Sequence, residues 1–294
     1  MAITVNTNIP SLTAQKSLNN ATSRMNTAME RMTTGLKINS SKDDAAGMAV
    51  ASKLDYKVSS LSVAQDNGQM GASMLDTAEG VLGVMKDNLV RIRDLTEQAA
   101  NGTYGEDAMK AIKTEVNARL DEISRLANSS EFNGKILFNG DKNKGGIENE
   151  IRLQVGITSD EDTSTIKLEK EIFAKATASS LIGTFNGKTA TKEVCDDAYT
   201  NDEKARAFLT NIDSAIENVT SRMTEIGGKQ QSIISAMTAA GVMETNLTSA
   251  SSLIKDADIA EESSNYIKQQ ILQQTSASLL ATANQAPSIA VNLI

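Results

Sequence analysis

The sequence has no histidine and no tryptophan, and it has one cysteine and two prolines among its 294 residues. Without histidine there is no His-based general base, no Ser-His-Asp triad and no histidine metal ligand. The single cysteine, Cys195, allows neither an intramolecular disulfide nor a thiolate metal cluster, and we expect it to be an incidental surface residue. The composition therefore argues against an enzyme and predicts no metal or other cofactor.

Aromatic residues are also scarce, at 3 % of the chain. A globular enzyme closes its core with bulky rings, whereas a thin bundle of helices can close with Ala, Leu, Ile and Met. The net charge of -8 and the pI near 4.8 argue against nucleic acid as a partner. The chain shows no run of 18 apolar residues and no signal-peptide pattern at its start, so we expect neither a membrane partner nor a cleaved signal.

The longest regular pattern runs from residue 47 to residue 99. Apolar or small residues recur there at alternating steps of three and four, with only Lys57 and Thr96 polar and no proline. This heptad pattern predicts one helix about 80 Å long, at roughly 1.5 Å of rise per residue. A helix of that length needs helix partners along it. We expect Ser40 or Ser41 to cap its start.

The remaining patterns predict a mainly α fold. It is a long antiparallel helical bundle or coiled coil built from both chain ends, with a small β-hairpin region in the middle of the sequence. Alternating apolar residues and Asn-Gly turns predict β-hairpins over 133–170, and we expect a surface loop with a short helix over 171–202. Besides the long helix, the heptad spacing predicts helices over 9–36, 106–127, 203–254 and 256–290.

These segments suggest two domains. The first is a terminal helix-pair core domain formed by residues 1–42 and 255–294. The second, residues 43–254, is a rod domain of three helices plus β-hairpins, in which 133–202 is the hairpin and variable-loop part.

The two terminal helices are apolar on more than one side and carry few charges. Such a surface is unfavourable in a monomer, so we expect it to be buried between copies of the chain. The residues expected to carry this self-assembly are Leu18, Met25, Met32, Ile267, Ile271, Leu272, Leu279 and Ala283.

Long motifs at both ends of the chain resemble those of bacterial flagellins. In the N-terminal half they are Ile-Thr-Val-Asn-Thr-Asn at 3–8, Gly-Leu-Lys-Ile-Asn-Ser-Ser-Lys-Asp-Asp-Ala-Ala-Gly at 35–47 and Phe-Asn-Gly at 132–134. In the C-terminal part they lie at 254–258, 270–274 and 283–287. The resemblance covers about 1–140 and 203–294 and indicates a minimal form, with the two conserved domains only and no outer variable domains.

The resemblance implies a structural subunit that polymerises into the bacterial flagellar filament for motility. It implies export of the unfolded chain through the flagellar type III channel and a secreted, extracellular location in the flagellum. The implied partners are other copies of the chain in a helical filament, an export chaperone at the C-terminal helix, and the filament cap and hook-junction proteins. Scarce cysteine and proline suit a chain that is exported unfolded.

The resemblance also implies an outside partner. Many flagellins are recognised by the flagellin-sensing Toll-like receptor of vertebrates, and the matching residues here are Arg91, Leu95 and Glu115. Arg91 and Leu95 lie four positions apart and off the seam of the long helix, so we expect them to share a face that is open in the monomer. The arginine can pair with a carboxylate and the leucine can fill a pocket.

Three other functions fit parts of this pattern. A hook–filament junction protein would have the same broad architecture, whereas a cytoplasmic signalling coiled coil is disfavoured by the alternating residues at 151–157 and by the apolar tails. An enzyme would have to use paired carboxylates such as Asp43–Asp44, Asp256 with Asp258, or Glu261–Glu262. Charge at helix N-termini explains these pairs more simply.

Overall fold

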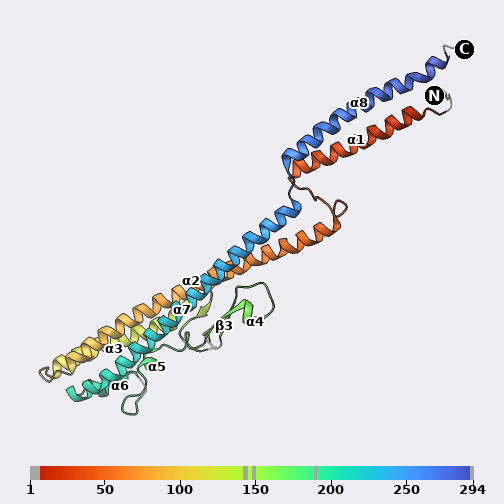
Figure 1. Ribbon diagram of the computed structural model, residues 1–294. Helices are drawn as coiled ribbons and strands as arrows, with labels where there is room; N and C mark the ends of the chain where they lie inside the picture. Colours follow the sequence, from red (N-terminus) through yellow and green to blue (C-terminus); the bar gives the residue numbers. More distant parts are fainter. Residues whose placement is uncertain (1–6, 142–144, 148–149, 189–190, 292–294) are drawn as a thin grey trace. The chain divides into compact units, whose positions relative to one another are not determined.

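The computed structural model describes residues 7–141, 145–147, 150–188 and 191–291, and it confirms a mainly helical fold with a small β region in mid-sequence (Figure 1). The outermost parts of the flagellin-like motifs, at 3–6 and 292–294, lie outside the described residues. The elements are α1 (Ile9–Thr34), α2 (Ala45–Ala99), α3 (Glu106–Ser129), β1 (Glu131–Phe132), β2 (Lys135–Ile136), β3 (Ile151–Gln154), α4 (Glu161–Ser164), β4 (Thr165–Leu168), α5 (Ala178–Ile182), α6 (Thr191–Ala198), α7 (Asp202–Lys255) and α8 (Ile259–Val291).

The chain forms two compact units. Unit 1 joins Met1–Ser59 to Glu244–Ile294, and unit 2 is Ser60–Met243. The long helices α2 and α7 each contribute residues to both units.

In unit 1, α1 and α8 lie side by side and antiparallel (Figure 1). The buried seam of α1 consists of alanines at heptad spacing, and the buried seam of α8 is polar at the same spacing. Because alanine and polar side chains bury little apolar area, these buried seams contribute little hydrophobic stabilisation. The two seams are Ala14, Ala21 and Ala28 on α1, and Glu262, Gln269 and Ser276 on α8.

Polar contacts set the register of this helix pair. Arg31 forms an ion pair with Glu262 at 2.9 Å, and the amide of Gln273 donates to the hydroxyl of Thr22 at 3.0 Å. The glutamate side chain is only 11 % exposed, so its charge depends on the arginine for compensation.

The ends of α1 and the start of α2 follow ordinary capping chemistry. The Asn8 side chain accepts a hydrogen bond from the Ser11 N–H at 3.1 Å, and Gly35 ends α1 with a φ of 72°. The expectation that Ser40 or Ser41 caps α2 is wrong. Asp44 is the cap, because its carboxylate accepts from the N–H groups of residues 46 and 47 at 3.0 and 2.9 Å.

In unit 2, the seam predicted on α2 is buried at every position from Leu61 to Ala99. It packs against α3 and α7, both antiparallel to it. Arg93 pairs with Asp213 on α7 at 2.7 Å, and Arg119 on α3 donates to Asn88 at 3.2 Å. The seam positions within unit 1 are less covered, since Val50 there is 50 % exposed.

The polar seam residue Thr96 has a partner from far along the chain. Its hydroxyl is hydrogen-bonded to the hydroxyl of Tyr199 and donates to the carbonyl of Ile92 at 2.7 Å. Both side chains are buried, and burial raises the pKa of Tyr199 above its ordinary value. In the heptad pattern Thr96 is an exception because it is polar. In the fold its buried hydroxyl has a hydrogen-bond partner in Tyr199, so it is satisfied.

Two short hairpins are present in the middle of the sequence. β1 and β2 flank the turn at Asn133-Gly134, where both residues have positive φ, and β3 pairs antiparallel with β4. The predicted turn and the predicted alternation over Ile151–Gln154 are therefore confirmed. The strand ends at Gln154. The predicted alternation continues to Ile157, but that residue lies in a loop and is 37 % exposed.

The segment 171–202 is not a surface loop with one short helix. It contains α5 and α6, and side chains such as Phe173, Leu181 and Cys195 belong to the core of unit 2. The prediction of a surface position for Cys195 is wrong, because α6 turns it inward; burial raises the pKa of its thiol to about 12. Outside the core, hydrogen bonds from Asn186 and Lys204 lower the pKa of Asp197 to about 2 and tie α6 to its neighbours.

Candidate functional site

Unit 1 exposes a set of large apolar side chains on α8. Ile267, Ile271 and Leu279 are 54 %, 57 % and 58 % exposed, and Leu272 is also exposed. A shallow apolar hollow on the helix is lined by Ile267, Ile271 and Leu272, together with Ser264 and Lys268. These four residues were expected to carry self-assembly, and the structure places them at the surface of a single chain.

The other residues expected to act in assembly lie partly covered along the helix pair. Leu18, Met25 and Met32 on α1 are half-buried, and so is Ala283 on α8. Met32 receives a weak hydrogen bond from the Ser263 hydroxyl at 3.9 Å. These four therefore stabilise the α1–α8 pair within one chain as well as bordering its exposed surface.

The residues expected from sequence leave out four large apolar side chains that are exposed in the described part of α1 and α8. A signal for them was available, because each stands off the heptad seam of its helix. They are Ile9, Leu12, Met29 and Ile259.

Lys268 lies in the apolar hollow, and beyond it α8 carries no charge. From Gln269 to its last residue the sequence has no charged side chain. An exposed apolar surface without charges is typical of one that is covered by another protein surface.

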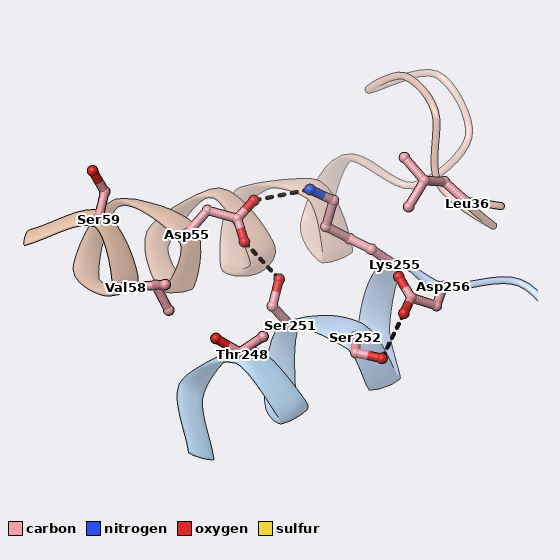
Figure 2. Close-up of a pocket in the computed structure, with 9 residues that line it drawn as sticks. All are labelled: Leu36, Asp55, Val58, Ser59, Thr248, Ser251, Ser252, Lys255 and Asp256. Carbon is pink, nitrogen blue, oxygen red and sulfur yellow. Dashed lines mark hydrogen bonds and ion pairs between the residues drawn. The ribbon is translucent and has the colours of Figure 1, made fainter. Parts of the chain in front are cut away.

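A polar cluster joins the two segments that lead into the helix pair (Figure 2). Asp55 on α2 accepts hydrogen bonds from Lys255 at 2.8 Å and from Ser251 at 2.7 Å, and both contacts lower the pKa of Asp55, the lysine contact most. The backbone N–H of Lys37 donates to the Lys255 carbonyl at 2.6 Å, and the N–H of Ala257 donates to the Gly35 carbonyl at 2.9 Å. The two connecting segments are thus held to each other at the base of α1 and α8.

The residues expected to contact a receptor lie in unit 2. The structure brings Arg91 on α2 and Glu115 on α3 together in an ion pair at 2.9 Å, with side chains 45 % and 38 % exposed. The expectation that Leu95 shares an open face with Arg91 is wrong, since Leu95 is only 3 % exposed. The reason is that α3 packs on this side of α2, so residues of α2 beside the heptad seam are buried as well.

Metal-ligand clusters and membrane-spanning helices are both absent from the part of the chain that the structure describes. No group of three or more Cys, Asp or Glu side chains there is arranged to hold a metal ion. No helix within those ranges has the length and apolarity needed to cross a membrane.

Comparison with known proteins decides the family. The family model for the bacterial flagellin N-terminal helical region matches residues 5–143, and the one for the C-terminal helical region matches residues 209–294. This chain belongs to the bacterial flagellin family. As a flagellin it is a subunit of the flagellar filament.

Two relatives illustrate how flagellins of different length compare with it. Polar flagellin C of Vibrio parahaemolyticus is 30 % identical over an alignment of 383 residues that covers 100 % of both chains. The flagellar filament 33 kDa core protein of Treponema phagedenis is 31 % identical over 297 residues, with 99 % of each chain covered. The first alignment is longer than this chain's 294 residues, so the Vibrio protein has residues that this flagellin lacks.

A solved structure supports the fold alone. The crystal structure of Bacillus cereus FlgL matches with a TM-score of 0.51 and 17 % identity, covering 66 % of this chain and 96 % of that chain.

Proposed function

We propose that this flagellin polymerises through the exposed apolar surface of unit 1. The single observation that carries the proposal is the set Ile267, Ile271, Leu272 and Leu279, exposed on a helix that has no charge beyond Lys268. Burying these side chains against neighbouring subunits removes apolar area from water in every subunit of the polymer, at about 25 cal/mol for each Å².

Protease sensitivity tests this proposal. The α1–α8 pair is held by an alanine seam and a polar seam, so in the monomer it opens readily and both ends are cut first. Limited proteolysis of monomer should trim about 40 residues from each end, and polymer formed by salting out should resist the same treatment. Negative-stain microscopy of the salted-out protein should show filaments of uniform width. Termini equally resistant in the monomer would contradict the proposal.

The same surface supports the predicted export route and partners. An uncovered apolar α8 suits an export chaperone that holds the C-terminal helix until the chain reaches the filament tip. A chain with one buried cysteine and two prolines crosses the flagellar type III channel unfolded without disulfides, and with few slow proline isomers on refolding. We propose secretion by this route, addition under the filament cap, and contact with the hook-junction proteins at the filament base.

We also propose the domain division expected from sequence. Residues 1–42 with 255–294 form the core domain through α1 and α8. Residues 43–254 form the rod domain, including the 133–202 region. The compact units have other bounds, because they divide within α2 and α7. The division proposed here is supported by the hydrogen bonds that join the two connecting segments near Lys37 and Lys255.

A second role rests on the exposed Arg91–Glu115 pair. We propose that the monomer is recognised there by the flagellin-sensing Toll-like receptor, with Leu95 supporting the pair from the core. An arginine paired with a carboxylate, half-exposed on a rigid helix pair, is a suitable small hot spot.

Receptor activation by surface variants tests this role. Arg91→Ala with Glu115→Ala should lower the potency of the monomer at least tenfold in a reporter assay, the size of effect expected for one hot-spot pair. The matched control is Arg125→Ala with Glu122→Ala, which removes another exposed ion pair of α3 at 2.6 Å. Equal potency of wild type and the Arg91/Glu115 variant would show that the assigned face is wrong, and a silent wild type would refute recognition itself.

A further inference from the structure

Four glycines lie in the middle of the two long helices of unit 2: Gly80 and Gly83 on α2, and Gly227 and Gly228 on α7. A glycine inside a helix costs about 1 kcal/mol relative to alanine. Apart from its chain neighbours and the nearby backbone of its own helix, a methyl group added at any of the four would meet no atom within 4 Å. Packing within the chain therefore does not explain why these positions lack a side chain.

Two other glycines of α2 show the contrast. A methyl group at Gly71 would collide with the side chain of Leu153, and one at Gly68 would press on Met237. At those two positions a side chain of another element lies close to the glycine, whereas the four glycines face open space.

The four glycines lie at one level of the helix pair. Asp76 contacts Gln230 at 2.7 Å, and Arg93 contacts Asp213 at 2.7 Å. These two contacts fix the register of the antiparallel helices, because each step forward along α2 corresponds to one step back along α7. In this register Gly80 lies opposite Ile226, and Gly228 lies opposite Ala78. All four glycines thus fall within residues 78–83 of α2 and 223–228 of α7.

The third helix ends at this same level. Arg91 contacts Glu115, and Asn88 contacts Arg119, so the end of α3 at Ser129 falls opposite residues 77–78 of α2. The core remains closed there, because Ala78, Leu82 and Ile226 are fully buried.

We propose that residues 78–83 and 223–228 form a flexible joint, at which α2 and α7 open their outer backbone hydrogen bonds and bend together. Each helix loses propensity support there, and α3 no longer covers them beyond that level. The contacts that remain there include those of Arg222 with the Ala174 carbonyl at 2.6 Å and of Lys229 with Glu169 at 3.4 Å. The two helices bend about the buried core side chains, which stay packed, so the helices do not separate. This inference does not depend on the assembly surface of unit 1.

Amide hydrogen exchange on the full-length monomer tests the joint. In the wild type, amides of 78–83 and 223–228 should exchange at least tenfold faster than amides one heptad away on the same faces of α2 and α7. The variant Gly80→Ala with Gly228→Ala should slow exchange about fivefold in each helix, the factor that corresponds to the helix propensity difference of about 1 kcal/mol.

The control is Gly241→Ala. It also lies in α7 and also has no atom within 4 Å of an added methyl group, but by the same counting it faces Gln65 rather than the joint. It should raise the stability of the helix and leave exchange at 78–83 unchanged. The proposal is overturned if the wild-type joint exchanges as slowly as its flanks, or if Gly241→Ala slows exchange there as much as the double variant does.

Discussion

Replacing Leu279 by aspartate is expected to abolish polymerisation and leave the monomer folded. Leu279 is 58 % exposed in the single chain, so the new carboxylate stays hydrated there and costs the monomer little. Once a neighbouring subunit covers the position, an unpaired charge costs several kcal/mol, and this cost recurs in every subunit. Circular dichroism should match wild type, while sedimentable polymer should disappear.

Thr103→Asp is the matched control for this experiment. It adds the same charge at an exposed position in the turn between α2 and α3, which belongs to unit 2. The control should polymerise as wild type does, which separates the effect of the site from the effect of one more negative charge. Filaments of normal yield from Leu279→Asp would contradict the assignment of the assembly surface.

Phe208→Ala should cause the largest loss of stability among the substitutions considered, about 3–5 kcal/mol. The ring is fully buried in unit 2 and packs edge-on against Phe185 at 5.2 Å and Tyr199 at 6.1 Å between ring centroids. Removing it leaves a cavity where α7 meets the 171–202 segment. A loss of this size lowers the midpoint of thermal unfolding by about 10 °C.

Thermal unfolding followed by circular dichroism measures this effect. Tyr104→Ala is the control, because this ring lies 43 % exposed in the turn after α2, and its removal should change stability by about 0.5 kcal/mol or less. A loss below about 1 kcal/mol for Phe208→Ala would mean that the aromatic cluster does not anchor the segment.

The rings of Phe185, Tyr199 and Phe208 also explain how a chain with 3 % aromatic residues closes its core. The helical part of unit 2 packs with residues such as Leu82, Met85 and Leu89, as the composition suggests. The rings are concentrated where the chain leaves the regular bundle, because irregular backbone needs larger side chains to fill the space that heptads fill elsewhere.

Local signals in the sequence were sufficient to predict most elements. The heptads predicted the long helices to within a few residues, Gly35 marked the end of α1, and Asn133-Gly134 marked a hairpin turn. These signals work because each depends on residues close in sequence, through helix period, glycine conformation or turn type. The apolar surface of α8 also followed from sequence, because its missing charges are visible without any fold.

Only the tertiary structure shows which helix faces are covered besides the heptad seams. Leu95 and Cys195 were both expected at the surface, and both are buried. A heptad pattern identifies one seam of a helix, but Leu95 is covered because α3 packs on a second face of α2. Cys195 is buried because the 171–202 segment folds back onto the bundle. These contacts join residues far apart in the chain, and the partner of Thr96 was invisible for the same reason, since Tyr199 lies 103 residues away.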